Sequence, residues 1–217
     1  MGTGGMNMIK VDHIETWGFE HAIRGMRNPL NSWDKSDTAF YSYPEEGKAH
    51  AIGENDLSLM QRLFKGGTEH RKYLRMIFVS MDITAPLYWW KEFDTYKVGT
   101  VANSCSTMHK IQAKKFEPED FSIEHLEGES LIAFENLLHV MNTHRQSFNV
   151  TKEKKYWWQM IQLLPTSYNQ KRTVTMSYEN VYTILRQRKG HKLDEWNKFC
   201  EILSDLPYIK EIGGIEE

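Results

Sequence analysis

The sequence predicts a fold in which helices and strands are mixed. Short stretches of strand length, residues 9–14, 73–81 and 172–176, carry β-branched and other apolar side chains that a sheet buries. Elsewhere apolar residues recur every three or four positions, as on the buried face of a helix. The 217 residues are 40% hydrophobic and 26% charged, an ordinary globular composition. We therefore predict a single domain over residues 1–217, with residues 1–8 as a flexible leader.

The first part of the chain reads as a strand, a short helix and a long loop. Residues 9–14 alternate as an opening strand does, and residues 19–26 follow a helical pattern. Residues 28–50 are polar and contain proline and tyrosine, so we predict an extended loop there. Loops of this length in a compact domain usually serve a function or cover a partner subunit.

The next part contains a capped helix, a buried strand and an aromatic helix. Asn55 or Asp56 is the expected N-cap of the first helix, and Gly66 is its natural stop. Residues 73–81 are rich in Ile, Val, Phe and Met and predict a mostly buried strand. The strand leads into a helix that starts at Pro86, where the missing N–H is tolerated.

The second half is mainly helical. Residues 98–107 predict a polar turn, and the mixed charges of residues 110–124 predict a surface connection. Ser177 is the expected cap of a helix that carries arginines in its last turn. Apolar spacing predicts helices over residues 129–146, 156–164, 177–188 and 193–203, with an acidic tail after Pro207.

Composition and missing motifs exclude several classes of protein. The net charge of −2 gives no general attraction to nucleic acid or to an anionic membrane. Cys105 and Cys200 are too few for a disulfide framework, and no apolar run is long enough to span a bilayer, so we predict a cytoplasmic protein. The sequence lacks a phosphate loop, a dinucleotide fingerprint and a metal-binding helix, and His139 and His144 would diverge on a helix.

The candidate site is the stretch of residues 85–109, where aromatic, charged and hydroxyl residues alternate around a glycine. Its hydroxyl, amide and backbone groups follow the end of a predicted helix. Such a segment offers many hydrogen-bond donors to a phosphate or a ring carbonyl. Cys105 lies within it, but a lone cysteine in a polar turn is usually not a nucleophile.

The order of landmarks from about Asp56 onward resembles the flavin-dependent thymidylate synthases. That family has a helix, a Glu-His pair, a strand and an aromatic helix near Ala-Pro, which look like residues 53–63, 69–70 and 85–86. Its closing landmarks are similar to Leu164-Pro165, Leu185-Arg186-Gln187-Arg188 and Trp196 here.

The family's Arg-His-Arg signature, followed by Asn-Glu-x-Ser, is only partly present. Residues 103–106 look like the second element, and the first falls on residues 96–98 or 95–97, so two registers stay open. In either register two arginines and the histidine are missing, and Lys97 is the remaining cation. One ammonium does not reproduce the planar fork of a guanidinium.

The resemblance implies an α+β subunit of the thymidylate synthase-complementing-protein-like fold, with a mixed sheet and several helices. It further implies a homotetramer with shared active sites, in which FAD lies over dUMP while methylenetetrahydrofolate and NADPH take part in reductive methylation. The flavin does the redox chemistry in such enzymes, and the protein positions the reactants. The implied site residues are Ser106 as catalytic residue; Glu69, His70, Tyr96, Lys97 and Asn103 at the cofactor; and Glu92, Ser104, Ser106 and Arg188 at the substrate, with no metal.

Two alternatives stay open beside this enzyme. The missing arginines suit a non-catalytic homologue that binds a nucleotide, a flavin or a protein partner. In the plainest alternative, residues 85–109 are only core and turn, and the function lies elsewhere.

Overall fold

The computed structural model describes residues 9–43 and 47–214, and the predicted leader at residues 1–8 lies outside them. The chain divides into two compact units. Unit 1 contains Asp82–Thr95, Ala102–Thr173 and the chain up to Asp12, and unit 2 contains His13–Met81, Tyr96–Val101 and the chain from Val174. The single domain stays a prediction.

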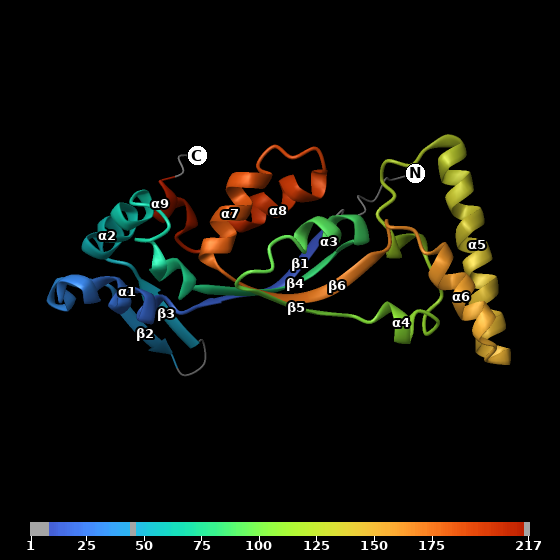
Figure 1. Ribbon diagram of the computed structural model, residues 1–217, viewed down its shortest axis with the longest axis horizontal. Helices are drawn as coiled ribbons and strands as arrows, with labels where there is room; N and C mark the ends of the chain where they lie inside the picture. The colour runs from blue at the N-terminus through green and yellow to red at the C-terminus, as the bar shows by residue number, and fades with distance from the viewer. Residues whose placement is uncertain (1–8, 44–46, 215–217) are drawn as a thin grey trace. The chain divides into compact units, whose positions relative to one another are not determined.

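A four-stranded sheet has the strand order β1-β4-β6-β5 (Figure 1). Its strands are β1 (Lys10–Trp17), β4 (Phe78–Pro86), β5 (Thr100–Ser104) and β6 (Asn169–Ser177), and each has residues in both units. The predicted strands at residues 9–14 and 172–176 are confirmed. The strand predicted over residues 73–81 begins later, because Lys72–Arg75 forms a 3-10 helix (η3) that puts Tyr73 and Leu74 into the core.

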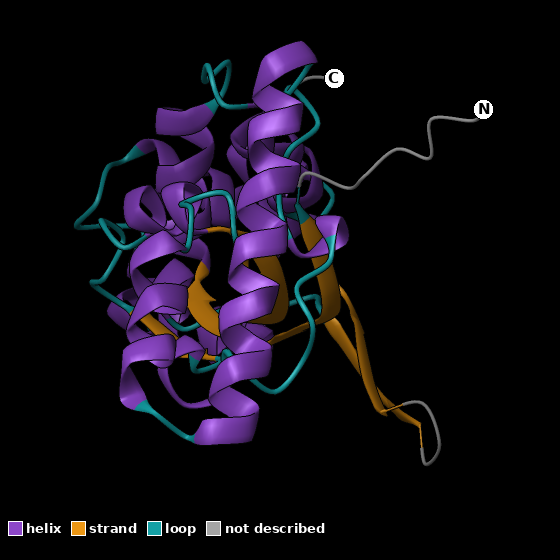
Figure 2. Ribbon diagram, turned by 90° about the vertical axis from the view of Figure 1, so that its right-hand side faces the viewer, coloured by secondary structure: helices purple, strands orange, loops and turns teal. Residues whose placement is uncertain are grey.

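The loop predicted over residues 28–50 was wrong in its second half. After two 3-10 turns, η1 (Asn28–Leu30) and η2 (Trp33–Lys35), β2 (Ala39–Tyr43) and β3 (Gly47–Ala51) pair antiparallel. The register joins Ala39 to Ala51, and the paired strands run side by side in Figure 2. The aromatic residues of β2 favour a strand, and this signal was hidden among polar and turn-forming neighbours.

Unit 2 is built mainly from helices. They are α1 (Phe19–Arg27), α2 (Glu54–Lys65), α7 (Tyr178–Arg188), α8 (Asp194–Ser204) and α9 (Ile209–Gly213). The prediction for α7 is confirmed, since the Ser177 hydroxyl accepts a hydrogen bond from the Asn180 N–H at 3.4 Å. Sequence reasoning missed α9, a short helix that follows Pro207 and buries Ile209 and Ile212.

The prediction that Asn55 or Asp56 caps α2 was wrong, because Gly53 occupies the N-cap and Asp56 lies inside the first turn. Asp56 is fully buried and accepts a hydrogen bond from Arg27 Nε at 2.6 Å. It also accepts from the hydroxyls of Ser36 and Thr38, each at 2.7 Å. The carboxylate therefore ties the segment after α1 to α2. Arg27 is itself only 4% exposed, so the ion pair is buried on both sides.

Unit 1 contains a core of its own, to which two antiparallel-packed helices contribute buried side chains. Its helices are α3 (Leu87–Phe93), α4 (Thr107–Lys110), α5 (Gly128–Thr151) and α6 (Lys154–Leu163), with a 3-10 turn η4 at Pro118–Asp120. The helices α5 and α6 run side by side (Figure 1). Phe134 and Met141 of α5 and Met160 of α6 are buried together, as the apolar spacing predicts.

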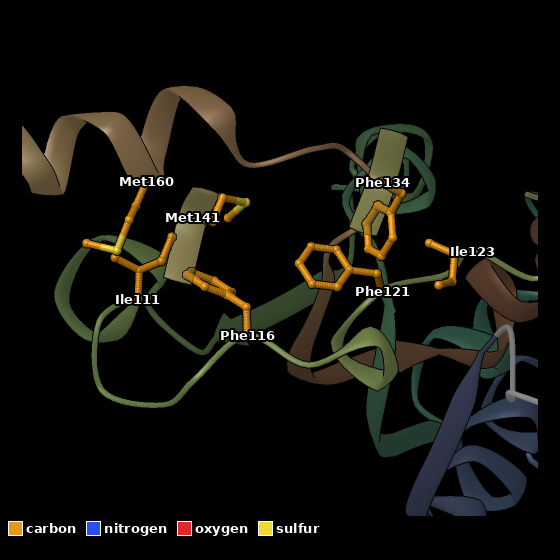
Figure 3. Close-up of a cluster of buried hydrophobic side chains, with 7 residues drawn as sticks. All are labelled: Ile111, Phe116, Phe121, Ile123, Phe134, Met141 and Met160. Atoms are coloured by element: carbon orange, nitrogen blue, oxygen red, sulfur yellow. The ribbon is translucent and has the colours of Figure 1, made fainter. Parts of the chain in front are cut away.

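The predicted surface connection at residues 110–124 was wrong. Its apolar residues Ile111, Phe116, Phe121 and Ile123 complete the buried cluster of Figure 3. Lysines and glutamates separate these residues in the sequence, so no helical or strand period reveals them.

The helix α3 also differs from the prediction, since Pro86 ends β4 and precedes α3 as its N-cap.

His50 lies in an aromatic cluster of unit 2. Its ring centroid is 4.2 Å from that of Phe19 and 5.5 Å from that of Tyr208. Burial lowers the pKa of His50, and its Nε2 has no hydrogen-bond partner among the described residues. The folded protein thus favours the neutral imidazole.

Stability is expected to fall as the pH drops below about 6.5, because the unfolded chain then binds a proton at His50 that the folded chain resists. The folded-state pKa lies below the unfolded one, so the loss begins at the unfolded pKa and ends at the folded one. Urea unfolding between pH 7 and 5 measures it, and His50→Phe should flatten the profile. The exposed His139 provides the control variant His139→Gln. An unchanged slope in His50→Phe contradicts this assignment.

Among the described residues, no helix is long and apolar enough to cross a membrane.

Candidate functional site

The predicted site residues divide between the two units. Unit 2 contains Glu69, His70, Tyr96, Lys97 and Arg188, and unit 1 contains Glu92, Asn103, Ser104 and Ser106.

Tyr96 and Arg188 lie in direct contact in unit 2. Arg188 Nε donates a hydrogen bond to the Tyr96 hydroxyl at 2.8 Å, and that hydroxyl donates to Gln187 Oε1 at 3.0 Å. The guanidinium carbon of Arg188 is 4.5 Å from the ring centroid of Trp196 and 5.5 Å from that of Tyr96. The rings of Tyr96 and Trp196 thus form an aromatic cage around the Arg188 guanidinium, which brings a predicted cofactor residue into contact with a predicted substrate residue.

The cage continues into the loop between α7 and α8. Arg188 Nη1 is 3.2 Å from His191 Nε2, and the Leu193 N–H donates to His191 Nδ1 at 3.2 Å. Asn197 Nδ2 donates to the His191 carbonyl oxygen at 2.8 Å. Sequence reasoning missed His191, because nothing in the local pattern marks a histidine in a loop as a partner of the preceding helix.

Replacing Arg188 by lysine is expected to destabilise the protein by about 1–2 kcal/mol, because an ammonium cannot stack on two rings while it bonds the Tyr96 hydroxyl. Urea unfolding of Arg188→Lys measures the loss. Arg186→Lys is the matched control, since Arg186 is exposed on the same helix turn and should change stability by less than about 0.5 kcal/mol. Equal stabilities for the two variants count against the cage.

Glu69 and His70 lie exposed in the turn after α2, where they are accessible to a ligand. The next residue, Arg71, was not predicted as a site residue. Its Nε forms an ion pair with Glu179 Oε1 at 3.1 Å, and its guanidinium carbon lies 5.3 Å from the Phe64 ring centroid. The signal for Arg71 was its place directly after the Glu-His pair.

Lys97 is also exposed, and the turn that follows it is held from α7. Asn180 Nδ2 donates to the Val98 carbonyl oxygen and to Thr100 Oγ1, each at 2.7 Å. Asn180 is in the first turn of α7, beside the cap residue Ser177. Lys97, the cation that remains where the family has its Arg-His-Arg signature, therefore lies directly before a turn that is hydrogen-bonded to α7.

In unit 1, Asn103 and Ser104 lie on a strand rather than in the predicted polar turn, because β5 covers Thr100–Ser104. Both side chains are exposed. The chain stays bonded to β6 directly after this strand, since the Cys105 N–H donates to the Lys171 carbonyl oxygen at 2.9 Å. Gln170 Nε2 donates to the Cys105 carbonyl oxygen at the same distance.

Ser106 has a structural role as the N-cap of α4. Its hydroxyl oxygen accepts a hydrogen bond from the His109 N–H at 3.2 Å, which leaves its proton available for donation. Ser106 also lines a small cavity of about 120 Å³ together with Lys110, Tyr168 and Lys171. This cavity is too small for a dinucleotide.

Glu92 is half-buried on α3, a helix that also contacts a cation that sequence reasoning did not single out. Arg172 lies with its guanidinium carbon 4.2 Å from the Trp90 ring centroid and donates to Asp94 Oδ1 at 2.8 Å. It also donates from Nε to Gln170 Oε1 at 3.0 Å. Arg172 therefore holds the aromatic helix against β6.

The mixed sheet and its helices form an α+β fold. Two solved structures are similar to the chain, both of thymidylate synthase X (ThyX) from Helicobacter pylori with FAD and dUMP. One superposes with a TM-score of 0.67 and covers 94% of this chain and 95% of its own, and the other has a TM-score of 0.65 with 94% and 96% covered.

Both structures are 16% identical in sequence, so the likeness shows the fold alone. No protein-family model matches the sequence, and no curated protein matches it either. The chain has the ThyX fold over almost its whole length, and the predicted fold class is confirmed.

Proposed function

We propose that the chain is a flavin-dependent thymidylate synthase-like protein. It methylates dUMP reductively to dTMP, with methylenetetrahydrofolate as carbon source, NADPH as reductant and FAD as cofactor. The observation that carries this proposal is the fold likeness over 94% of the chain to ThyX structures that hold FAD and dUMP. The order of sequence landmarks is consistent with it.

The flavin side is proposed to use Glu69, His70, Tyr96, Lys97 and Asn103. The exposed imidazole, carboxylate and ammonium of unit 2 suit the polar groups of a flavin dinucleotide, and Lys97 suits its diphosphate. Tyr96 is 9% exposed and its hydroxyl is bonded to Arg188. Its proposed role at the flavin is therefore to hold neighbouring groups in place. The bound flavin supplies the redox chemistry.

The nucleotide side is proposed to use Glu92, Ser104, Ser106 and Arg188. The Ser106 hydroxyl keeps its proton for donation to a substrate oxygen and is proposed as the catalytic residue. The cage holds Arg188 in one orientation, which reduces the side-chain entropy lost when it meets a phosphate.

The assembly is proposed to be a cytoplasmic homotetramer with active sites shared between chains. Light scattering coupled to gel filtration measures the subunit number. A monomer at micromolar concentration would contradict shared sites.

Flavin binding tests the cofactor part of the proposal. Protein incubated with FAD and desalted is expected to keep a yellow flavin spectrum. Lys97→Ala should weaken FAD binding roughly tenfold or more, the effect of one lost charge-assisted contact. Lys35→Ala, an exposed lysine of η2, is the control and should bind as the parent protein does. A colourless protein that binds no FAD contradicts the proposal.

A second candidate is a non-catalytic homologue that binds a flavin or nucleotide as an interaction module. The observation that favours it is the engagement of Arg188 by Tyr96 and Trp196, because a guanidinium used inside the chain has fewer donors left for a substrate. Bound FAD without any turnover of dUMP is the result this candidate predicts.

A further inference from the structure

The outer face of α5 is exposed but carries few of the charges that a solvent-facing helix surface usually has. The helix has 24 residues, all of them described, and at about 1.5 Å per residue it is about 36 Å long. Phe134 and Met141 lie on its inner face, within the buried cluster. Among residues 136–151 no exposed side chain is a carboxylate, a lysine or an arginine. Depletion of charge is the compositional mark of the centre of a protein interface.

The exposed residues of this face repeat with the spacing of a helix-packing seam. They follow one another at intervals of four, three, four, three and four positions, the average period of 3.5 that keeps one face against a partner helix. This outer seam consists of Ile132, Asn136, His139, Thr143, Gln146 and Val150. Its apolar ends are open to water, since Ile132 is 59% exposed and Val150 is 84% exposed. The whole seam belongs to unit 1.

The spacing of the outer seam is the same in both directions along the helix, so the seam matches an antiparallel copy of itself. Pairing about the middle of α5 brings together Ile132 with Val150, Asn136 with Gln146, and His139 with Thr143. The first pair is apolar. The second joins two amides and the third joins an imidazole to a hydroxyl, groups that both donate and accept hydrogen bonds.

Charges at the two ends of α5 favour this antiparallel direction. Glu129 lies in the first turn of α5, whereas Lys152 is its C-cap and Lys154 is the first residue of α6. Lys155 is already paired with Glu153 at 2.7 Å, but within the described chain Lys152 and Lys154 have no ion-pair partner. An antiparallel copy places its carboxylate beside these lysines, whereas a parallel copy places like charges together.

The helix dipole explains only part of this charge pattern. An acid at the start of a helix and a cation at its end are favourable, so Glu129 and Lys152 suit α5 by themselves. Lys154 opens α6, where the dipole disfavours a cation, and the first turn of α6 contains no acid. Its ammonium lies 5.8 Å from the ring centroid of Trp158, which is 44% exposed. A carboxylate from a partner would offset the unfavourable position of Lys154.

We propose that the outer seam of α5 packs against the same seam of a second copy of this chain, antiparallel about a two-fold axis. A second copy is favoured over another protein because the symmetric spacing and the opposite end charges both match α5 to itself. Each contact occurs twice in such an interface. The contact names one surface of the homotetramer proposed above, and it needs neither flavin nor substrate.

Light scattering coupled to gel filtration tests the contact on the full chain. We expect Val150→Glu to halve the mass of the parent oligomer, because the new carboxylate lies opposite Ile132 and near Glu129 of the other copy. Val98→Glu is the matched control and should keep the parent mass, since Val98 is 90% exposed in a turn of unit 2. A cooperative thermal transition shows that each variant is folded.

Charge reversal tests the direction of the pairing. Glu129→Lys and Lys154→Glu should each raise the dissociation constant of the oligomer roughly tenfold or more, since each brings like charges together in both halves of the contact. The double variant should restore association close to that of the parent. Lys154→Glu also suits the dipole of α6, so weaker association in this variant does not come from a weakened helix.

The outcomes separate this contact from the proposed function. A monomeric parent overturns the contact and the homotetramer together. An oligomer whose mass Val150→Glu leaves unchanged overturns the contact alone, and a double variant that stays weakly associated overturns the antiparallel pairing. An oligomer that depends on the outer seam in a protein that binds no FAD supports this inference while it contradicts the proposed function.

Discussion

Replacing Asp56 by asparagine is expected to destabilise the protein by about 3–5 kcal/mol, the effect of breaking a buried ion pair. The asparagine leaves the Arg27 charge in a site where that side chain is only 4% exposed. It also presents an NH₂ group, which cannot accept, to some of the donors from Ser36, Asp37 and Thr38. The unsatisfied donors then add to the effect of the unpaired charge.

The same residue gives a pH dependence with a definite sign. Burial alone would raise the pKa of Asp56, but the hydrogen bonds from Thr38, Ser36 and Arg27 and the Arg27 charge outweigh it and lower the pKa. The stabilisation is therefore complete above the unfolded-state pKa of about 3.9 and is lost as the pH falls through the folded-state pKa. Asp56→Asn should not show this acid-range loss.

Urea unfolding at pH 7 measures the loss of stability in Asp56→Asn and in a control variant, Asp205→Asn. Asp205→Asn removes an ion pair of the same type with Lys210, but Asp205 is 75% exposed. Exposed ion pairs contribute about 0–1 kcal/mol to stability, so the free energy of unfolding of this control should remain close to that of the parent protein. A loss below about 1 kcal/mol in Asp56→Asn would show that the carboxylate does not hold the segment after α1.

Replacing Gly18 by alanine is expected to destabilise the protein by about 2–5 kcal/mol. Gly18 has φ 93°, and a Cβ there would overlap the Met76 carbonyl oxygen. The left-handed backbone accounts for about 1–2 kcal/mol in a residue with a side chain. Overpacking against a backbone atom adds about 1–3 kcal/mol, because the carbonyl oxygen cannot rotate away as a side chain can.

Gly67→Ala separates the two contributions. Gly67 has φ 99°, close to that of Gly18, but a Cβ at Gly67 would meet nothing within 4 Å. This variant should therefore lose only the backbone part, about 1–2 kcal/mol. Thermal unfolding of both variants measures the difference, and equal losses would exclude the clash with Met76.

Local signals in the sequence were sufficient to predict many of the helices and strands of the fold. Ser177 caps α7 as predicted, since an N-cap acts on an N–H only three residues away. Asp56 carried the same kind of signal, yet its partners are Arg27 and residues 36–38, brought to it by a chain reversal that no short pattern encodes. Ile111 and Phe116 were likewise hidden, because their burial depends on α5 and α6.

The candidate site was predictable only as a set of segments. Tyr96 and Arg188 were both named, but their contact joins residues 92 positions apart and needed the fold. Arg71 and Arg172 escaped notice for a similar reason. Each is fixed by partners far along the chain, Glu179 for Arg71 and Trp90 for Arg172.

The contacts of Arg188 bear directly on the two candidate functions. A caged guanidinium is pre-oriented, which favours tight binding of a phosphate if its outer donors remain accessible. The same contacts are sufficient to explain its presence without any substrate. The contacts of Arg188 thus suit both a binding role and a structural role, and turnover of dUMP distinguishes the two candidate functions.

The most direct test of the proposed function is tritium release from tritium-labelled dUMP, with FAD, NADPH and methylenetetrahydrofolate present. We predict release that depends on each of these components and falls strongly in Ser106→Ala, while Lys35→Ala, whose lysine lies in η2, releases tritium as the parent does. Absence of release from folded protein that has bound FAD would contradict thymidylate synthesis and leave the non-catalytic homologue.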